Sequence, residues 1–302
     1  MGMKKEVLTR SFAHTASLFL AILFCESFLG RAANSQQQSA QDEPGSQFTG
    51  SSAIVHSQAT AAEGTNDGSL AIPAGTILPV RLNSTISRNN SRAGQVITGR
   101  IMQDVPLSPG ERIRAGSKVT GHIVEWIPAS NGVQVRVSLQ FDKLIFSHQI
   151  ISMTTNLRAM AGFMQIEEAQ TPPIGPGESD VYRWLTTVQV GGDVVYGDGG
   201  PVTTDDNPDQ IVGKKVSNGV LGKVRAKEGT QCRGAIDGND GPQALWVFST
   251  DACGIYGIAH LSIAHAGRTD PIGVITLASD TSNLKIAGGT GMLLRVDASS
   301  RN

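Results

Sequence analysis

The residues with the clearest chemical potential are two cysteines, Cys232 and Cys253. The only other cysteine, Cys25, lies in an N-terminal segment with the features of an export signal. An exported protein meets oxidising conditions, in which an even pair of cysteines forms a disulfide. The loop between them would hold about 20 residues, and closing it would contribute about 3 kcal/mol. The alternative is a pair of unpaired buried thiols.

Two acidic stretches have the side chains that a cation binds. Residues 237–241 (DGNDG) are as rich in oxygen ligands as a calcium loop, but Phe248 stands where an EF-hand loop carries its last acidic ligand. Asp205, Asp206 and Asp209 form the second acidic group. Asp, Asn and Gly also dominate tight turns for conformational reasons. We therefore expect solvated turns at both places.

The histidines and the glycine-rich stretches do not match a catalytic or phosphate-binding motif. His260 and His265 are separated by an odd spacing, so a strand would place them on opposite faces, away from a shared zinc ion. The stretches 191–200 and 286–291 lack the GxxxxGK[ST] pattern and are expected to be hairpin turns. No Gly-x-Ser-x-Gly nucleophile motif occurs. The sequence predicts no catalytic residue, no metal ligand and no cofactor.

Aromatic residues offer a further possibility, because Trp and Tyr side chains can stack on a sugar ring. In strands, however, aromatic residues more often belong to the core. Both interpretations stay open for Trp126, Trp184, Trp246, Tyr182, Tyr196 and Tyr256.

The elements that would position these residues are strands, and three of them begin with one pattern. The segments are IPAGTILPVRL (72–82), IRAGSKVTGHI (113–123) and IAGGTGMLLRV (286–296). Each has a glycine followed by a hydroxyl residue: Gly75 and Thr76, Gly116 and Ser117, Gly289 and Thr290. Glycine adopts backbone conformations that other residues resist, and the hydroxyl can bond the nearby backbone. We predict the same turn followed by a strand at all three places.

The rest of the chain also favours strands. Residues 133–141 (VQVRVSLQF) alternate between apolar and polar, as in a half-buried antiparallel strand. Short strand candidates separated by Gly- and Asp-rich turns follow residue 180. Residues 156–179 are expected to be a connector with at most two helical turns, because prolines and glycines interrupt it. The predicted fold class is all-β: a Greek-key-like or distorted β-barrel with an inserted or appended β-rich lobe.

The N-terminus predicts export. Residues 1–32 combine a basic start, a short apolar core at 16–25 and small residues at Gly30 and Ala32 for cleavage. An uncleaved anchor over 11–29 is the alternative, although His14 and Glu26 interrupt it. Residues 33–69 are polar and predict a disordered linker. No later segment predicts a transmembrane helix.

The charge balance bears on partners. Without residues 1–32 the chain keeps 21 basic and 24 acidic residues. A nearly neutral chain has no general electrostatic attraction to nucleic acid, so no nucleic-acid partner is expected.

Residues 72 to about 162 resemble the C-terminal β-barrel of the TrbI family, a conjugation and type IV secretion subunit that spans the periplasm and helps build the outer-membrane core channel. The motifs are the first two segments above, GQVITGRIMQDV (94–105) and VQVRVSLQFDKLIF (133–146). LKIAGGTGMLLRV (284–296) is similar to the strand that closes that barrel. The resemblance, over about 70–162 and 284–297, implies a related barrel in the cell envelope. The family's pore-forming helix pair has no counterpart in this sequence, so channel formation is not implied.

These observations predict a barrel at 70–164, an inserted β-rich lobe with the disulfide at 165–283, and closing strands and a tail at 284–302. The expected function is that of a non-catalytic scaffold, exported to the periplasm, envelope or exterior, with an envelope protein as partner. A secreted carbohydrate-binding module is the first alternative and an exported hydrolase the second. Nothing in the sequence determines the oligomeric state.

Overall fold

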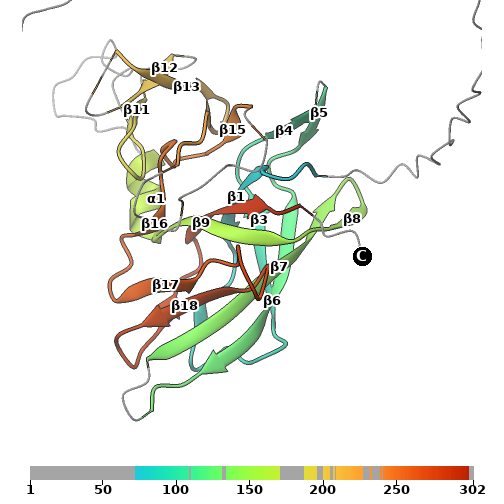
Figure 1. Ribbon diagram of the computed structural model, residues 1–302, viewed down its shortest axis with the longest axis vertical. Coiled ribbons are helices and arrows are strands. Elements are labelled where there is room, and N and C mark those ends of the chain that lie inside the picture. The colour runs from blue at the N-terminus through green and yellow to red at the C-terminus, as the bar shows by residue number, and fades with distance from the viewer. Residues whose placement is uncertain are drawn as a thin grey trace, which may run out of the picture. The chain divides into compact units, whose positions relative to one another are not determined.

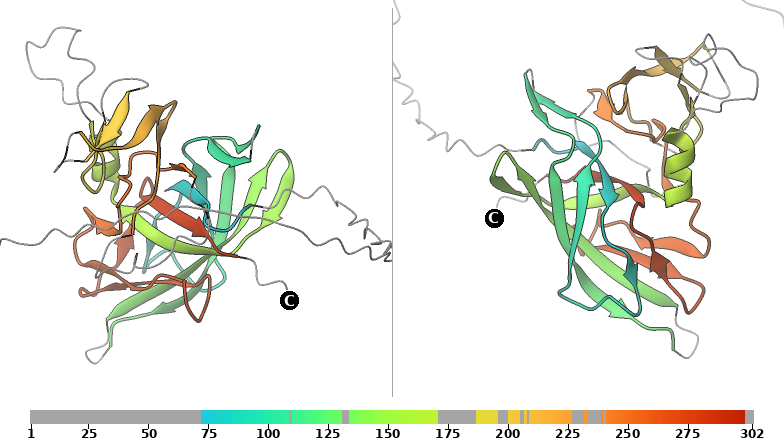
Figure 2. Two further views of the ribbon diagram at one scale, coloured as in Figure 1. Left: turned by 45° about the horizontal axis from the view of Figure 1, so that its top comes forward. Right: turned by 180° about the vertical axis from the view of Figure 1, so that it is seen from behind.

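A computed structural model describes residues 72–108, 110–130, 134–170, 187–195, 200–204, 207, 209–226, 232, 239 and 241–298 (Figures 1 and 2). The predicted signal segment and linker, 1–32 and 33–69, lie outside the described residues. Within the described residues the chain is nearly all β, with one helix, α1 (Phe163–Gln170). The predicted all-β fold class is confirmed. No helix in these ranges is both long and apolar enough to cross a membrane.

The larger sheet is barrel-like and nearly closed. Its strands are β1 (Ile77–Leu82), β3 (Val96–Ile101), β6 (Lys118–Ile127), β7 (Val135–Phe146), β8 (Gln149–Ser152), β9 (Thr155–Ala161), β16 (Gly254–Tyr256), β17 (Leu261–His265), β18 (Ile275–Ser279) and β20 (Gly291–Val296). Their order is β16-β9-β20-β1-β3-β6-β7-β18-β17, and β8 pairs with β7. The β16–β9 pair is parallel and the others are antiparallel. Because β1 pairs with β20, the first and last described strands lie side by side.

A second sheet of six strands forms the lobe, inserted in the sequence between α1 and β16. Its strands, in both chain and spatial order, are β10 (Thr187–Val188), β11 (Val194–Val195), β12 (Pro201–Thr203), β13 (Ile211–Val216), β14 (Gly219–Gly222) and β15 (Gln243–Ala244). Figure 1 shows α1 next to this sheet, on the side where β16 runs. Two small ribbons complete the fold: β2 (Ile86–Ser87) with β19 (Lys285–Ile286), and β4 (Val105–Ser108) with β5 (Glu111–Ile113).

The three repeated corners share one geometry. Gly75, Gly116 and Gly289 have φ angles of 82°, 89° and 89°, in the left-handed region that favours glycine. The next residue's hydroxyl donates in each case to the carbonyl oxygen three residues before it, at 2.7 Å: Thr76 to Pro73, Ser117 to Arg114, Thr290 to Ala287. The corners lead into β1, β6 and β20. One local sequence pattern therefore starts three strands of the barrel.

Burial shows which face of the barrel the lobe covers. In β3 and over 118–123 of β6 the residues alternate between the core and the outside, as a half-exposed sheet requires. Every residue of β9 and β20 is buried, and all but one of β1. Residues such as Leu78 and Leu294 face the barrel core, while Ile77 and Leu293 belong to a second core with α1 and the lobe. The lobe therefore packs on the outer face of β9, β20 and β1.

Two predictions about the lobe's boundaries are wrong. The predicted lobe, 165–283, includes β16, β17 and β18, but these strands belong to the barrel sheet, where β18 pairs with β7. The predicted connector from residue 156 begins instead with β9, which is buried on both faces. A strand buried on both faces shows no alternation, so its short apolar run LRAMA looks the same as a helical segment in the sequence.

Candidate functional site

The candidate site lies where the lobe meets the barrel, and Gln103 holds the two together. This fully buried side chain follows β3. Its Oε1 accepts hydrogen bonds from the backbone N–H groups of Trp246 (2.6 Å) and Val220 (3.2 Å), and its Nε2 donates to the Val220 carbonyl (2.9 Å). Gly219 passes so close that a Cβ there would collide with Gln103 Oε1 and lie 2.6 Å from Trp246 Cα. One amide therefore satisfies three buried backbone groups of the lobe side.

A second polar joint is built from Arg158, which stands at a register shift in the barrel. Leu293 pairs with Ala159 and Leu294 with Leu157, so Arg158 is the extra residue between them. Such a shift redirects a side chain. The guanidinium donates to the carbonyl oxygens of Arg225 (2.6 Å) and Thr250 (3.2 Å). Burial lowers the pKa of Arg158 to about 10, with Arg295 adding to this effect and Asp251 opposing it.

Asp193 completes this joint from the lobe side. Its carboxylate is buried, accepts a hydrogen bond from Thr250 N at 2.6 Å and lies 3.6 Å from the Arg225 guanidinium. Burial raises the pKa of Asp193 above its ordinary value, while the bonds to Thr250 and the charge of Arg225 oppose the shift. The barrel and the lobe thus each place a buried charged side chain at this joint, Arg158 and Asp193, next to the apolar core that they share.

The cysteines lie beside this joint. Cys232 and Cys253 form a disulfide across 21 positions of the chain. Cys232 Sγ lies 3.5 Å from the Arg158 carbonyl oxygen, and Cys253 immediately precedes β16, which pairs with β9. The predicted disulfide is confirmed, and it ties the lobe to the start of β16, the strand that pairs with β9 and its Arg158.

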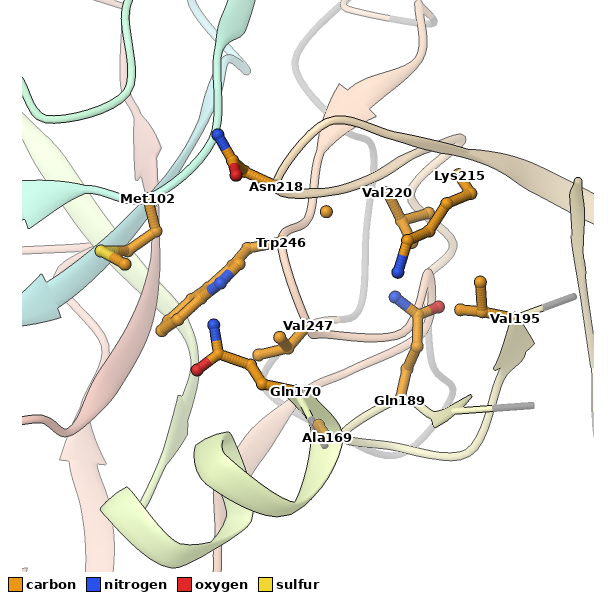
Figure 3. A pocket seen from close by; sticks show the side chains of 11 residues that line it. Met102, Ala169, Gln170, Gln189, Val195, Lys215, Asn218, Val220, Trp246 and Val247 are labelled. Atoms are coloured by element: carbon orange, nitrogen blue, oxygen red, sulfur yellow. The ribbon is translucent and has the colours of Figure 1, made fainter. Parts of the chain in front are cut away.

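A pocket of about 220 Å³ opens between α1, the lobe and the loop after β3 (Figure 3). Its apolar lining comes from Met102, Ala169, Val195, Val220, Trp246 and Val247. Its polar lining consists of Gln170, Gln189, Lys215 and Asn218. Figure 3 shows the Lys215 ammonium group pointing toward the Gln189 side chain, and the Gln170 amide next to the Trp246 ring.

Two lining residues are held in unusual states. Trp246 has a φ of 55°, a backbone conformation that is a true outlier for a bulky residue, and its side chain is almost fully buried. Gln189 is 4 % exposed, and neither its Nε2 nor its Oε1 has a hydrogen-bond partner among the described residues. Buried polar atoms without partners are rare in folded proteins, so these two atoms call for a physical explanation.

The other residues that the sequence singled out do not come together here. His260 is exposed beside Asp280 (Nδ1–Oδ1 2.9 Å), and His265 Nδ1 lies 2.8 Å from the Val274 carbonyl oxygen, within its own hairpin. The part of the chain that the structure describes has no group of His, Cys, Asp or Glu that could hold a metal ion. Asp205, Asp206 and Asp237 lie outside the described residues.

The aromatic residues do not share one exposed face where the structure describes them. Trp126 packs against the barrel core, while Trp246 and Tyr256 belong to the second core. Trp184, Tyr182 and Tyr196 lie outside the described residues. Of the candidates for sugar stacking, Trp246 lines the pocket.

Sequence reasoning missed the residues that matter most at the junction. Gln103 lies inside the segment 94–105 quoted above, but nothing there marks its role, and Gln189 stands in no motif. Gln243 of β15, whose Oε1 accepts a hydrogen bond from the Ile77 N–H of β1 (3.0 Å), is equally unmarked. Arg158 had a signal, because it is a charged residue within an apolar run. The chain has no match among protein-family models, curated proteins or solved structures.

Proposed function

We propose that this protein is an exported, non-catalytic scaffold of the cell envelope, in which a TrbI-like barrel holds the disulfide-linked lobe in a fixed orientation toward a protein partner. The observation that supports this proposal is the polar joint made by Gln103 and Arg158. Both side chains come from the barrel, and both bond backbone groups on the lobe side. Such bonds are directional, so they fix orientation in a way that apolar packing alone does not.

The lobe also has apolar side chains available for a partner. Ile211 on β13 is 67 % exposed and Val188 on β10 is 56 % exposed. Apolar residues at exposed positions are the usual anchors of protein interfaces, although single ones also occur on free surfaces. The barrel offers a matched position, because Val96 on β3 is 64 % exposed.

The test is capture of partners from envelope fractions with the tagged mature chain and two variants, Ile211→Asp on the lobe and Val96→Asp on the barrel. We expect the wild type and Val96→Asp to capture the same protein and Ile211→Asp to lose it. Circular dichroism checks that both variants fold. Equal capture by all three proteins, or capture of nothing specific, contradicts the proposal that the lobe is presented to a partner.

A further inference from the structure

The unpartnered Gln189 side chain and the pocket around it lead beyond the scaffold function. We propose that this pocket binds a small ligand through a secondary amide group, as carried by an N-acetylated sugar or a short peptide. A carboxamide side chain offers one donor, Nε2, and one acceptor, Oε1, side by side. A secondary amide complements either group, because its carbonyl can accept from Nε2 or its N–H can donate to Oε1. The N–H and C=O of one trans amide point in opposite directions, so one amide makes one of these two bonds.

Gln189 is prepared for this role by its backbone. Its N–H donates to the Asp193 carbonyl at 2.7 Å and its carbonyl accepts from Gly192 N at 3.0 Å, which closes the β10–β11 turn. The next residue, Val190, exchanges backbone hydrogen bonds with Val247 and Ser249, both at 2.9 Å. The side chain therefore projects from a fixed turn, and a ligand does not have to order it. Preorganisation of this kind raises affinity, because less conformational entropy is lost on binding.

The rest of the lining fits a ligand that carries both an amide and a small apolar group. Trp246 and Val247 add apolar surface to the pocket, which suits the methyl of an acetyl group. No carboxylate lines the pocket, and Lys215 has no ion pair among the described residues. Its ammonium group can therefore donate to a hydroxyl or carboxylate oxygen of the ligand.

The size of the pocket limits the ligand. Its volume of about 220 Å³ is below the range of about 300–1,000 Å³ that is typical for drug-sized molecules. One sugar ring or one capped amino acid is the expected scale. A longer chain would have to leave through the open side, past the exposed Asn218 and Gln170.

The experiment uses ligand-observed NMR on the purified mature chain, with N-acetylglucosamine and N-acetylglycine as probes. Glucose and acetate are the controls, because they lack the amide. We expect one or both N-acetylated probes to bind at least tenfold more tightly than their control, the factor that corresponds to about one hydrogen bond. N-acetylglucosamine binding identifies the sugar as the source of the amide, and N-acetylglycine binding identifies the peptide. Equal binding of probe and control, or no binding of either probe, overturns the proposal.

Three variants locate the binding. Gln189→Met removes both hydrogen-bonding groups at similar length and is expected to weaken binding of the N-acetylated probe about tenfold or more. Lys215→Met is expected to weaken binding less than Gln189→Met does. Its effect should be larger for N-acetylglycine than for N-acetylglucosamine, because N-acetylglycine has a carboxylate. Lys214→Met is the matched control, since Lys214 neighbours Lys215 on β13, faces the other side and does not line the pocket.

The variants also separate folding from binding. Lys215 is only partly buried, so its replacement tests the pocket even where Gln189→Met fails to fold. Unchanged binding of the N-acetylated probe by folded Gln189→Met, or equal losses for Lys215→Met and Lys214→Met, overturns the proposal. None of these results depends on a protein partner, so the scaffold function is tested separately.

Discussion

The barrel and the lobe bury their polar groups in different ways. In the barrel, β6 and β7 run for 10 and 12 residues, and the corners close with hydrogen bonds between residues three apart. In the lobe no described strand exceeds six residues. Gln103 and Arg158, which satisfy buried groups on the lobe side, belong to the barrel and lie 67 to 143 positions away. The lobe depends on these two barrel side chains, and in the other direction the barrel relies on Gln243 of β15, which accepts a hydrogen bond from the buried Ile77 N–H of β1 (3.0 Å).

The largest effect is expected where this dependence is concentrated, at Gln103. Gln103→Leu leaves two buried backbone N–H groups, those of Val220 and Trp246, without partners, whereas the Val220 carbonyl keeps its hydrogen bond from Leu245 N (2.9 Å). Each buried unsatisfied group costs about 1–3 kcal/mol, so the two together should lower the free energy of unfolding by about 2–6 kcal/mol. Urea denaturation measures this change. Gln149→Leu on β8 is the control, because Gln149 is exposed, and it should change stability by less than about 0.5 kcal/mol.

Hydrogen exchange of the same variant, Gln103→Leu, shows which backbone amides lose protection. The amides of β13 and β14 should lose protection, while those of β6 and β7 keep it. Loss of protection across both sheets together would contradict the view that Gln103 stabilises the lobe more than the barrel.

The disulfide is expected to have the next largest effect. Replacing Cys232 and Cys253 by Ser removes a covalent loop of 21 positions, and a loop of that length contributes about 3 kcal/mol in the chain-entropy account. Because the bond joins the lobe to the strand next to β9, the variant's lobe should unfold at lower denaturant concentration than its barrel. Fluorescence and hydrogen exchange along a urea series measure the two transitions. A single transition at the wild-type midpoint would contradict this prediction.

The difference between the two regions also explains what the sequence could predict. The corners were predictable because glycine and hydroxyl residues act on their own backbone within three positions. The disulfide was predicted because an even pair of cysteines follows a segment with the features of an export signal. The boundary of the lobe was not predictable, because β16 and β18 are short and take their place in the barrel only through distant partners, β9 and β7.

The candidate site was even less visible. Gln103 and Gln189 are ordinary residues in the sequence, and their roles depend on what the fold places around them. Trp246 was noticed as an aromatic residue, but its left-handed backbone and its contacts with Gln103 and Gly219 are visible only in the fold. Sequence patterns report local backbone chemistry. A junction between two sheets is made by residues far apart in the sequence, so it leaves almost no local pattern.

Alanine substitutions at the glycine corners should lower stability by a smaller amount. They distinguish the corner at Gly116, where a Cβ would meet no other atom, from the corner at Gly289, which lies against α1. Gly116→Ala places a Cβ in open space, so it should cost only the left-handed strain, about 1–2 kcal/mol. Gly289→Ala has the same strain, but its Cβ would lie 2.6 Å from Phe163 Cδ2 of α1. Gly289→Ala should therefore be the more destabilising of the two in thermal denaturation. Equal costs would show that α1 moves aside freely.

The smallest effect concerns the buried Asp193, and it is a dependence on pH. Burial raises the pKa of Asp193 in the folded state, so the folded protein takes up this proton at a higher pH than the unfolded chain does. The cost of the buried carboxylate is therefore fully present at neutral pH and is relieved as the pH falls through the raised pKa toward the ordinary value. Asp193→Asn keeps an acceptor for Thr250 N but has no proton to gain.

Urea denaturation of both proteins between pH 7 and pH 4 measures this effect. The wild type should gain stability relative to Asp193→Asn as the pH falls, because every other titrating group is common to the two proteins. If the difference stays constant, the carboxylate is not desolvated and the joint is open to water. If the difference has the opposite sign, the charges of Arg225 and Arg158 outweigh burial, and the lobe is held to the barrel by ion pairs more than by desolvated hydrogen bonds.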